Sequence, residues 1–200
     1  MKSFIEEARH KQIVAAAISV LAREGYASAS LSRIAREAGI SKSIITYHFS
    51  GKDEMFEAVY RLVESSASSY IAPLMETEED PSGMIAAYIR NQIGYMKEHR
   101  DELLAIGQLA MSHGGQDGPD YMATSAQEEA RLLADLMAEG QRRGIFRDFD
   151  RRVMAAAISK AIESALTEWA YRPDTDLDAY GNELVTLFLR GMEKRENDTS

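Results

Sequence analysis

SASLSRIAREAGISKSIITYHFSGKDEMF, residues 28 to 56, is the stretch that decides the fold of this 200-residue chain. Its apolar residues recur at helical spacing, stop at Gly39 and resume shortly after it. The first run comprises Leu31, Ile34, Ala35 and Ala38, and the second comprises Ile40, Ile44, Ile45 and Phe49. The pattern predicts two short helices that meet at a tight corner, as in a helix-turn-helix.

The residue types around the corner agree with this prediction. Gly39 adopts a positive φ at no steric cost, and the small side chain of Ala35 lets the second helix cross close over the first. Ser30 and Ser41 each precede a helical run, where a hydroxyl can accept a hydrogen bond from the first turn. We therefore expect both serines to act as N-caps and Phe49 to lie in the core.

The polar face of the predicted second helix indicates what it could contact. It combines a cation, hydroxyl groups and aromatic rings, namely Lys42, Ser43, Thr46, Tyr47 and His48, with Lys52 just beyond. Such groups suit the phosphate oxygens and base edges of DNA. Every amphipathic helix has a polar face, however, so this segment alone is equally compatible with a helix that only faces solvent.

A longer pattern bears on this choice. Residues 30 to 42, followed by YHFSGKDEMF at 47 to 56, closely resemble the DNA-binding domain of tetracycline-repressor-type (TetR-family) transcriptional regulators. The resemblance covers roughly residues 8 to 60 and includes an Ile-Ala-x-x-Ala-Gly-Ile-Ser core, a His-Phe pair and a downstream Lys. These regulators commonly carry a Tyr two residues before the His. Here that position is Thr46 and the Tyr is at 47, which leaves open which of the two contacts phosphate.

The resemblance implies an all-α fold of about nine helices. Residues 1–52 would form a three-helix DNA-binding domain with a helix-turn-helix, a linking helix would span about 53–71, and residues 72–200 would form a helical domain for ligand binding and dimerisation. It also implies a homodimeric repressor that binds a near-palindromic double-stranded operator and is released by a small-molecule effector. The alternative is an all-helical ligand-carrying or interaction module that no longer reads DNA.

The charge distribution agrees with a DNA-binding N-terminal segment. The net charge is −9, but residues 1 to 52 hold eight Lys and Arg against four acids, a net charge of +4, which leaves −13 for the remainder. An acidic body would repel DNA everywhere except at the basic face, although acidity also keeps proteins soluble. The candidate DNA contacts are Ser30, Arg33, Ser41, Lys42, Ser43, Thr46, Tyr47, His48 and Lys52.

The rest of the chain shows helical periodicity. We expect helices at about 6–24, 82–99, 100–112, 120–143, 150–171 and 177–194, besides the helix-turn-helix and the linking helix. The first should bury Ile13, Ala17, Val20 and Leu21 and end at Gly25, and the linking helix should bury Met55, Phe56, Val59, Leu62 and Val63. Pro73 and the acidic stretch 76–83 predict a loop, because proline stops helices.

The last two helices are the expected dimer interface. The segment 155–166 is dense in small side chains that permit close helix approach, and the last helix offers a matching apolar patch. The candidate contacts are Ala157, Ile158, Ala161, Ala165, Leu184, Leu187 and Phe188. From the residues alone, packing within one subunit explains them equally well. The resemblance favours dimerisation, because the last two helices of each TetR-family subunit form a four-helix bundle.

A ligand pocket is implied by the resemblance within the same region. Methionine and aromatic side chains with few polar groups suit an apolar or drug-like molecule, and such residues share a helix face at 84 to 95. A stripe of this kind is more often ordinary core. The candidate ligand contacts are Met84, Tyr88, Asn91, Tyr95, Met111, Tyr121 and Trp169.

Other functional classes lack a supporting pattern. The four histidines have no metal-site spacing, and the sequence contains no nucleophile elbow and no glycine-rich cofactor motif, so we expect no enzyme, metal or cofactor. The chain has no cysteine, which agrees with a reducing cytoplasm. No secretory signal and no membrane-spanning run is apparent, so we expect a cytoplasmic protein without a membrane partner.

Overall fold

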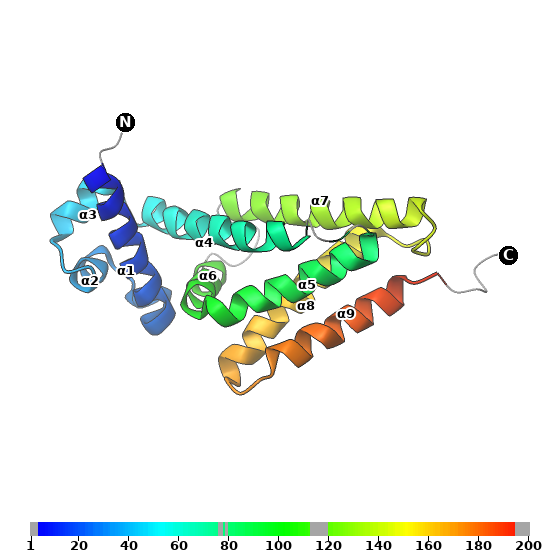
Figure 1. Cartoon of the computed structure of the whole chain (residues 1–200). Helices are drawn as coiled ribbons and strands as arrows, with labels where there is room; N and C mark the ends of the chain where they lie inside the picture. Colours follow the sequence, from blue (N-terminus) through cyan, green and yellow to red (C-terminus); the bar gives the residue numbers. More distant parts are fainter. Residues whose placement is uncertain (1–3, 76–77, 79, 113–119, 195–200) are drawn as a thin grey trace. The chain divides into compact units, whose positions relative to one another are not determined.

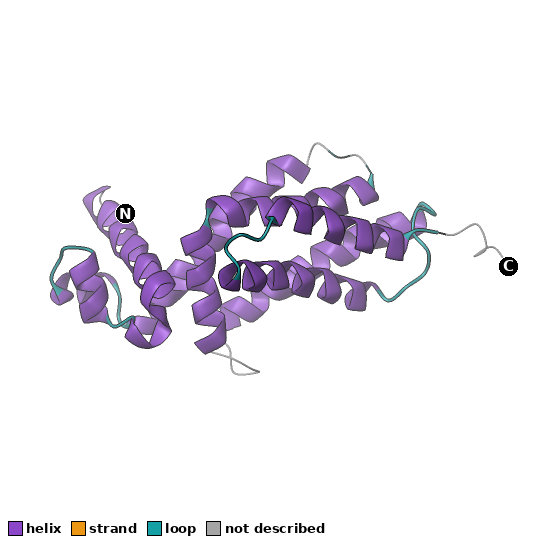
Figure 2. Cartoon of the chain, turned by 90° about the horizontal axis from the view of Figure 1, so that it is seen from below, coloured by secondary structure: helices purple, strands orange, loops and turns teal. Residues whose placement is uncertain are grey.

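The computed structural model describes residues 4–75, 78, 80–112 and 120–194, and this part of the chain is helical (Figures 1 and 2). Its nine helices are α1 (Phe4–Ser28), α2 (Leu31–Glu37), α3 (Lys42–His48), α4 (Lys52–Met75), α5 (Pro81–Glu98), α6 (Arg100–Ser112), α7 (Asp120–Arg142), α8 (Arg151–Tyr171) and α9 (Leu177–Met192). The predicted all-α fold is therefore confirmed. One isolated backbone bridge joins Phe146 to Glu193.

The helices pack into two compact units that are discontinuous in sequence. Unit 1 comprises Met1–Ser66 and His99–Met122, and unit 2 comprises Ala67–Glu98 and Ala123–Ser200. The first unit thus combines α1, α2, α3 and the first half of α4 with α6, which lies far along the chain. These units are groups of packed helices, so the functional boundaries expected at residues 52 and 72 stay a prediction.

The core of unit 1 is built on α1. Its predicted stripe of Ile13, Ala17, Val20 and Leu21 is fully buried, and α1 packs against α2 and, more extensively, against α6. Gly25 has a φ of 76°, which interrupts the helical conformation at the predicted residue, although a turn follows it before Ser28. The ring of Tyr26 then packs against Phe56 of α4 at 5.5 Å between centroids, as a core aromatic would.

The core of unit 2 is built on α5, which packs against α8 and α9. Ile85, Ile89 and Ile93 are buried along one stripe of α5, and Gly181 lets α9 approach until a Cβ at that position would lie 3.4 Å from Ile93. Exposed polar pairs flank this contact: Arg90 donates to Asn182 at 3.1 Å, and Lys97 lies 2.6 Å from Asp178. Apolar burial therefore holds α5 to α9, and the rim pairs add little.

The helix boundaries agree with the predicted ones except around Pro73. The expected stop at this residue is wrong, because α4 continues through Pro73 to Met75. Proline removes one backbone N–H, and so close to the helix end this disturbs only the last turn. The α5 helix begins at Pro81, where the missing N–H has no intrahelical partner to lose. Leu62, expected to be buried, is 41% exposed.

The helices were compared with the length and apolar character of a membrane-spanning helix. None of the helices among the described residues combines the length and the apolar character needed to cross a bilayer.

Candidate nucleic-acid interface

The α2–α3 pair forms the predicted helix-turn-helix at one end of unit 1 (Figure 1). Ser30 caps α2, because its hydroxyl accepts a hydrogen bond from the Arg33 N–H at 3.2 Å. At the corner Gly39 has a φ of +67°, a conformation that residues with a Cβ rarely adopt. The Ala38 N–H bonds the Ile34 carbonyl at 2.9 Å and closes the first helix. The corner is therefore built as the sequence predicts.

Side chains of α1 hold the corner and the C-terminal end of α3. At the corner, the Gln12 amide donates to the carbonyl of Ala38, the C-cap of α2, at 2.7 Å. At the C-terminal end, Phe49 is 2% exposed and its ring lies 4.6 Å from that of His10. Between them Ile45 is fully buried. These contacts fix the orientation of α3, so its polar face is presented by a rigid support.

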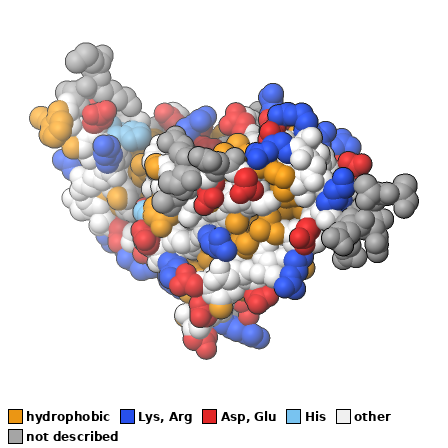
Figure 3. Space-filling view, turned by 45° about the vertical axis from the view of Figure 1, so that its right-hand side comes forward, with side chains coloured by type: hydrophobic (Ala, Val, Ile, Leu, Met, Phe, Trp, Pro, Cys, Tyr) orange, Lys and Arg blue, Asp and Glu red, His pale blue; other side chains and the backbone are white. Residues whose placement is uncertain are grey.

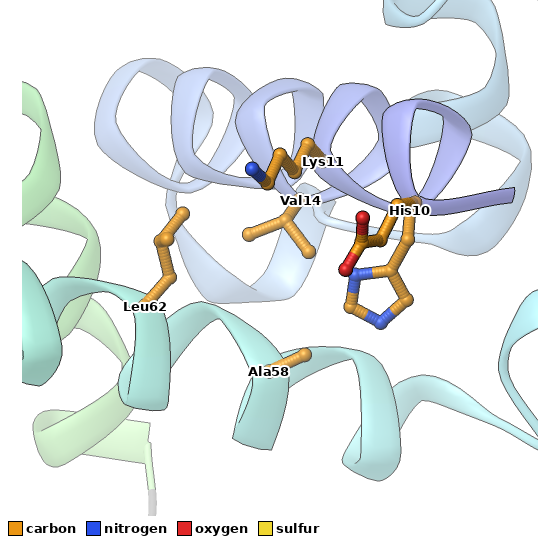
Figure 4. A pocket seen from close by; sticks show the side chains of 6 residues that line it. His10, Lys11, Val14, Ala58 and Leu62 are labelled. Atoms are coloured by element: carbon orange, nitrogen blue, oxygen red, sulfur yellow. The ribbon is translucent and has the colours of Figure 1, made fainter. Parts of the chain in front are cut away.

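A cavity of about 300 Å³ lies between α1 and α4 beside this support (Figure 4). Its walls are Glu7, His10, Lys11 and Val14 from α1 and Ala58 and Leu62 from α4. This cavity explains why Leu62 is partly exposed, since α1 and α4 do not close over it. His10 connects the cavity to Phe49 and hence to the end of α3.

The predicted contact face of α3 is open to solvent. Lys42, Ser43, Thr46 and Tyr47 are exposed, and Tyr47 keeps 75% of its surface. His48 is half-buried, and its ring meets the edge of Tyr47 at 5.2 Å. The structure thus gathers on one helix the groups that suit a major groove. The Thr46 hydroxyl donates to the Ser43 carbonyl at 3.1 Å, and the side chain remains exposed.

Ser41 departs from expectation in one respect. It stands at the N-cap position of α3, but its side chain makes no capping hydrogen bond. Its hydroxyl instead lies 2.8 Å from the Ser43 hydroxyl. Both serines are exposed, so this pair can exchange its mutual hydrogen bond for bonds to phosphate oxygens.

Arg33, an expected DNA contact, belongs to an ion-pair cluster between α1 and α2, so a contact with DNA would require it to leave these partners. Its guanidinium lies 2.5 Å from Glu24 and 3.0 Å from Glu37, and Arg23 reaches Glu37 at 2.9 Å. The Ser19 hydroxyl donates to Glu37 at 3.2 Å. Hydrogen bonds from Arg23 and then Arg33 lower the pKa of Glu37 to about 2. Arg33 therefore joins the two helices.

This cluster predicts an acid-sensitive contribution to stability. The folded pKa of Glu37 is about 2 against an ordinary value of 4.5, so the contribution is complete above pH 4.5 and is lost as the pH falls towards 2. We expect Glu37→Gln to lower the urea midpoint at pH 7, and the gap from the parent protein to shrink below pH 4.5. Glu7→Gln, also on an exposed carboxylate of unit 1, is the control. A gap that stays constant with pH would contradict the assignment.

Lys52 is also engaged within the protein. Its ammonium donates to the Tyr26 carbonyl at 3.2 Å and lies 3.9 Å from the centroid of the Tyr26 ring and 5.2 Å from that of Phe56. Burial lowers the pKa of this amine, and the nearby Asp53 opposes the shift. The expected phosphate contact would require the ammonium to leave these partners. No local pattern predicts this contact, since Tyr26 and Lys52 are 26 positions apart.

A substitution at Gly39 tests the effect of its positive φ separately from packing. A Cβ on Gly39 would meet nothing within 4 Å, so Gly39→Ala tests the positive φ without a steric clash. We expect a loss of about 1 kcal/mol in the free energy of unfolding, the cost of a left-handed alanine. Gly51→Ala is the matched control, because that position is equally open and has no positive φ. Equal unfolding midpoints for the two variants would contradict this explanation.

The seven candidate ligand contacts divide between the two units. Met111 and Tyr121 belong to unit 1, where Met111 is 78% exposed and Tyr121 packs on Tyr60 at 5.1 Å. The other five belong to unit 2. There Tyr95 is 1% exposed and packs on Tyr70 at 5.6 Å, so it is a core residue. The remaining residues of unit 2 are the half-buried Met84, Asn91 and Trp169 and the buried Tyr88.

The Tyr88 hydroxyl has hydrogen-bond partners that the sequence did not predict. Its hydroxyl donates to the carboxylate of Glu129 on α7 and accepts a hydrogen bond from the Gln92 amide at 3.2 Å. The shared helix face at residues 84 to 95 instead predicts Asn91 as the amide group near Tyr88. Tyr88 and Gln92 are four positions apart, so they were detectable as neighbours on α5, whereas nothing local connects either of them to Glu129.

The candidate dimer contacts divide by burial. Ile158 and Ala165 are fully buried within the chain, and Leu184 and Phe188 are each 9% exposed. These four side chains serve mainly the core of one subunit, so they have little surface left for a partner. Leu187 at 64% and Ala157 are exposed, as is Val153 at 67% on the same helix as Ala157. On the face shown in Figure 3, exposed hydrophobic side chains lie among charged ones.

Comparison with known proteins identifies the architecture. Residues 13–59 match the model of the bacterial regulatory proteins of the tetR family. Over 136 residues the chain is 33% identical to the HTH-type transcriptional regulator BetI of Vibrio parahaemolyticus, an alignment that covers 66% of this chain and 67% of that protein. The chain belongs to the TetR family. It is therefore a helix-turn-helix transcriptional regulator, and α2 and α3 are its DNA-binding motif.

Two further transcriptional regulators extend the likeness over most of the chain. The regulator BetI 2 of Chromohalobacter salexigens is 28% identical over 177 residues, which cover 88% of this chain and 83% of that protein. A transcriptional regulator from Saccharomonospora viridis, solved in complex with choline, superposes with a TM-score of 0.79 at 25% identity and covers 94% of this chain and 99% of that one. The family fold thus extends well beyond the DNA-binding motif.

Proposed function

We propose that this TetR-family member is a dimeric repressor that binds a near-palindromic operator and is released by a small-molecule effector. The observation that carries the proposal is the rigidly supported, solvent-exposed polar face of α3, with Lys42, Thr46 and Tyr47 outward and Ile45 and Phe49 buried beneath. A helix presented in this way fits a major groove. We place Ser41, Lys42, Ser43, Thr46, Tyr47 and His48 at the groove and Ser30 on a flanking phosphate.

Dimerisation supports this function energetically. A seven-residue recognition helix makes few base contacts, so one copy binds weakly, and two half-sites about one helical turn apart combine their binding energies. We place the dimer contact on the exposed parts of α8 and α9, around Ala157 and Leu187. Val153 extends this surface. The two-fold axis of such a dimer would match the symmetry of the operator.

Effector control requires two conformations with different affinities for the effector. A ligand that binds one of them more tightly shifts the population towards it and thereby changes the spacing of the two recognition helices. We place the effector site in the helical domain that follows α4. The S. viridis regulator, which was solved in complex with choline, supports the expectation of a small-molecule effector. Tyr88 and its polar partners in unit 2 are the best-defined candidate contacts.

The first experiment is selection of bound sequences from a random duplex pool by the purified protein. Recovery of a two-fold-symmetric motif would support a dimeric operator-binding regulator, and the position of that motif in promoters would indicate the regulated genes. Absence of enrichment at low salt would argue for a helical module that no longer reads DNA. Mass spectrometry of the denatured sample would show whether a co-purified effector had instead held the protein in its released state.

A further inference from the structure

The first turn of α1 contacts the exposed face of α3 (Figure 1). The Tyr47 hydroxyl donates a hydrogen bond to the Glu6 carboxylate at 3.4 Å, although 41 positions separate the two residues. Glu6 is half-buried, whereas its neighbour Glu7 is exposed and lines the cavity between α1 and α4. Both acids stabilise the N-terminal end of α1 through the helix dipole. The dipole therefore explains neither the burial of Glu6 nor its contact with Tyr47.

This hydrogen bond limits what the Tyr47 hydroxyl can offer to DNA. A phenolic hydroxyl has a single proton, and Tyr47 donates it to Glu6. The phosphate oxygens of DNA are acceptors, so a phosphate contact would need this same proton. A phosphate at the hydroxyl would also lie close to the negative charge of Glu6, which repels it. Tyr47 is therefore poorly suited to bind phosphate while Glu6 holds it, and base edges are its better partners.

The capacity that remains to the Tyr47 hydroxyl is that of an acceptor. Its lone pairs can accept from an exocyclic amino group, which cytosine and adenine present in the major groove. The side chain is 75% exposed, and its ring is supported by an edge contact with His48 at 5.2 Å. We propose that Tyr47 reads the amino group of a cytosine or adenine in each half-site and that Glu6 is its positioning residue. This inference rests on the proposed function, in which α3 enters the major groove, and it adds the base chemistry that one residue recognises.

The test repeats the selection from a random duplex pool with the full-length parent protein and its variants. Tyr47→Phe removes the hydroxyl and keeps the ring, and Glu6→Ala removes the acceptor that holds the hydroxyl. We expect the parent motif to require an adenine or cytosine at one position of each half-site, and both variants to lose this preference by about fivefold. Glu6→Gln keeps an acceptor oxygen and should keep the preference. Glu7→Ala is the matched control, because it removes an acid from the same turn of α1.

An operator in which that base lacks its amino group, with purine for adenine or pyrimidinone for cytosine, tests the contact directly. Fluorescence anisotropy should show that the parent loses about fivefold in affinity for each altered half-site. Tyr47→Phe should lose nothing further on this operator, because the contact is already absent. Equal weakening of operator and random duplex by Tyr47→Phe would indicate a phosphate contact and overturn the proposal. A loss of preference in Glu6→Gln as large as in Glu6→Ala would overturn the positioning function of Glu6.

Fluorine NMR of the free protein, labelled with fluorotyrosine, separates this inference from the proposed function. The Tyr47 signal is the one that Tyr47→Phe removes, and we expect it to shift in Glu6→Ala and to stay in place in Glu7→Ala. An unmoved Tyr47 signal in Glu6→Ala would overturn the assignment of Glu6 whatever the DNA results. If the parent recovers a motif and the Glu6 and Tyr47 variants recover the same one, this inference fails and the repressor stands. If the parent recovers no motif, the repressor fails and the base contact fails with it.

Discussion

Lys42→Ala should weaken binding to the operator and to unrelated duplex alike, by about thirtyfold, because a dimer loses two charge-assisted contacts that together contribute about 2 kcal/mol. The exposed ammonium stands at the first residue of α3, where it can reach a phosphate at the edge of the groove. Each phosphate contact contributes about one to the slope of log affinity against log salt, so the slope should fall by about two for the dimer. Fluorescence anisotropy across a salt series measures both quantities.

Thr46→Ala provides the contrast that makes this result specific. Its exposed methyl and hydroxyl carry no charge, so we expect selective loss of operator affinity with an unchanged salt slope. Arg151→Ala removes an exposed cation from unit 2 and controls for net charge. Thermal midpoints should be unchanged in all three variants, since their side chains are exposed. Equal losses for Lys42→Ala and Thr46→Ala on both kinds of DNA would contradict the division between phosphate and base contacts.

Local signals in the sequence account for most of the fold. Apolar spacing located every helix to within a few residues, and Gly39 and Ser30 act at the corner as expected because turn chemistry and capping depend on neighbouring residues. The error at Pro73 is also local. Proline stops a helix only where a lost hydrogen bond matters, and two residues from the end it matters little.

Long-range contacts are what the sequence could not supply. Arg33 and Lys52 are candidate DNA contacts because basic residues are concentrated in residues 1 to 52, yet in the structure Glu24 and Tyr26 of α1 hold them. Nothing in the spacing of these residues reveals the pairings, since they depend on how α1 crosses α2 and α4. Glu129 was missed for the same reason: it is one of several acids on a polar helix, and only Tyr88 on α5 distinguishes it.

The function of Lys52 follows from this contact and can be tested with two substitutions. Lys52→Ala removes the aliphatic stem and the ammonium that cover the rings of Tyr26 and Phe56, so we expect a loss of about 2 kcal/mol in the free energy of unfolding. Lys52→Met keeps the stem and should retain most of this stability. The Tyr26 carbonyl stays satisfied in both variants, because the Ala29 N–H also donates to it at 3.2 Å.

DNA binding by the same variants decides whether Lys52 supports the fold or contacts phosphate. If Lys52 supports the fold, Lys52→Met should keep the DNA affinity and the salt slope of the parent. If Lys52 contacts phosphate, the salt slope of the dimer should fall by about two. We expect the first result, because releasing the ammonium would break its contacts with Tyr26 and Phe56. Lys42→Ala, measured in parallel, gives the change in salt slope that the loss of an exposed cation causes. A reduced salt slope in Lys52→Met would show that Lys52 contacts DNA phosphate.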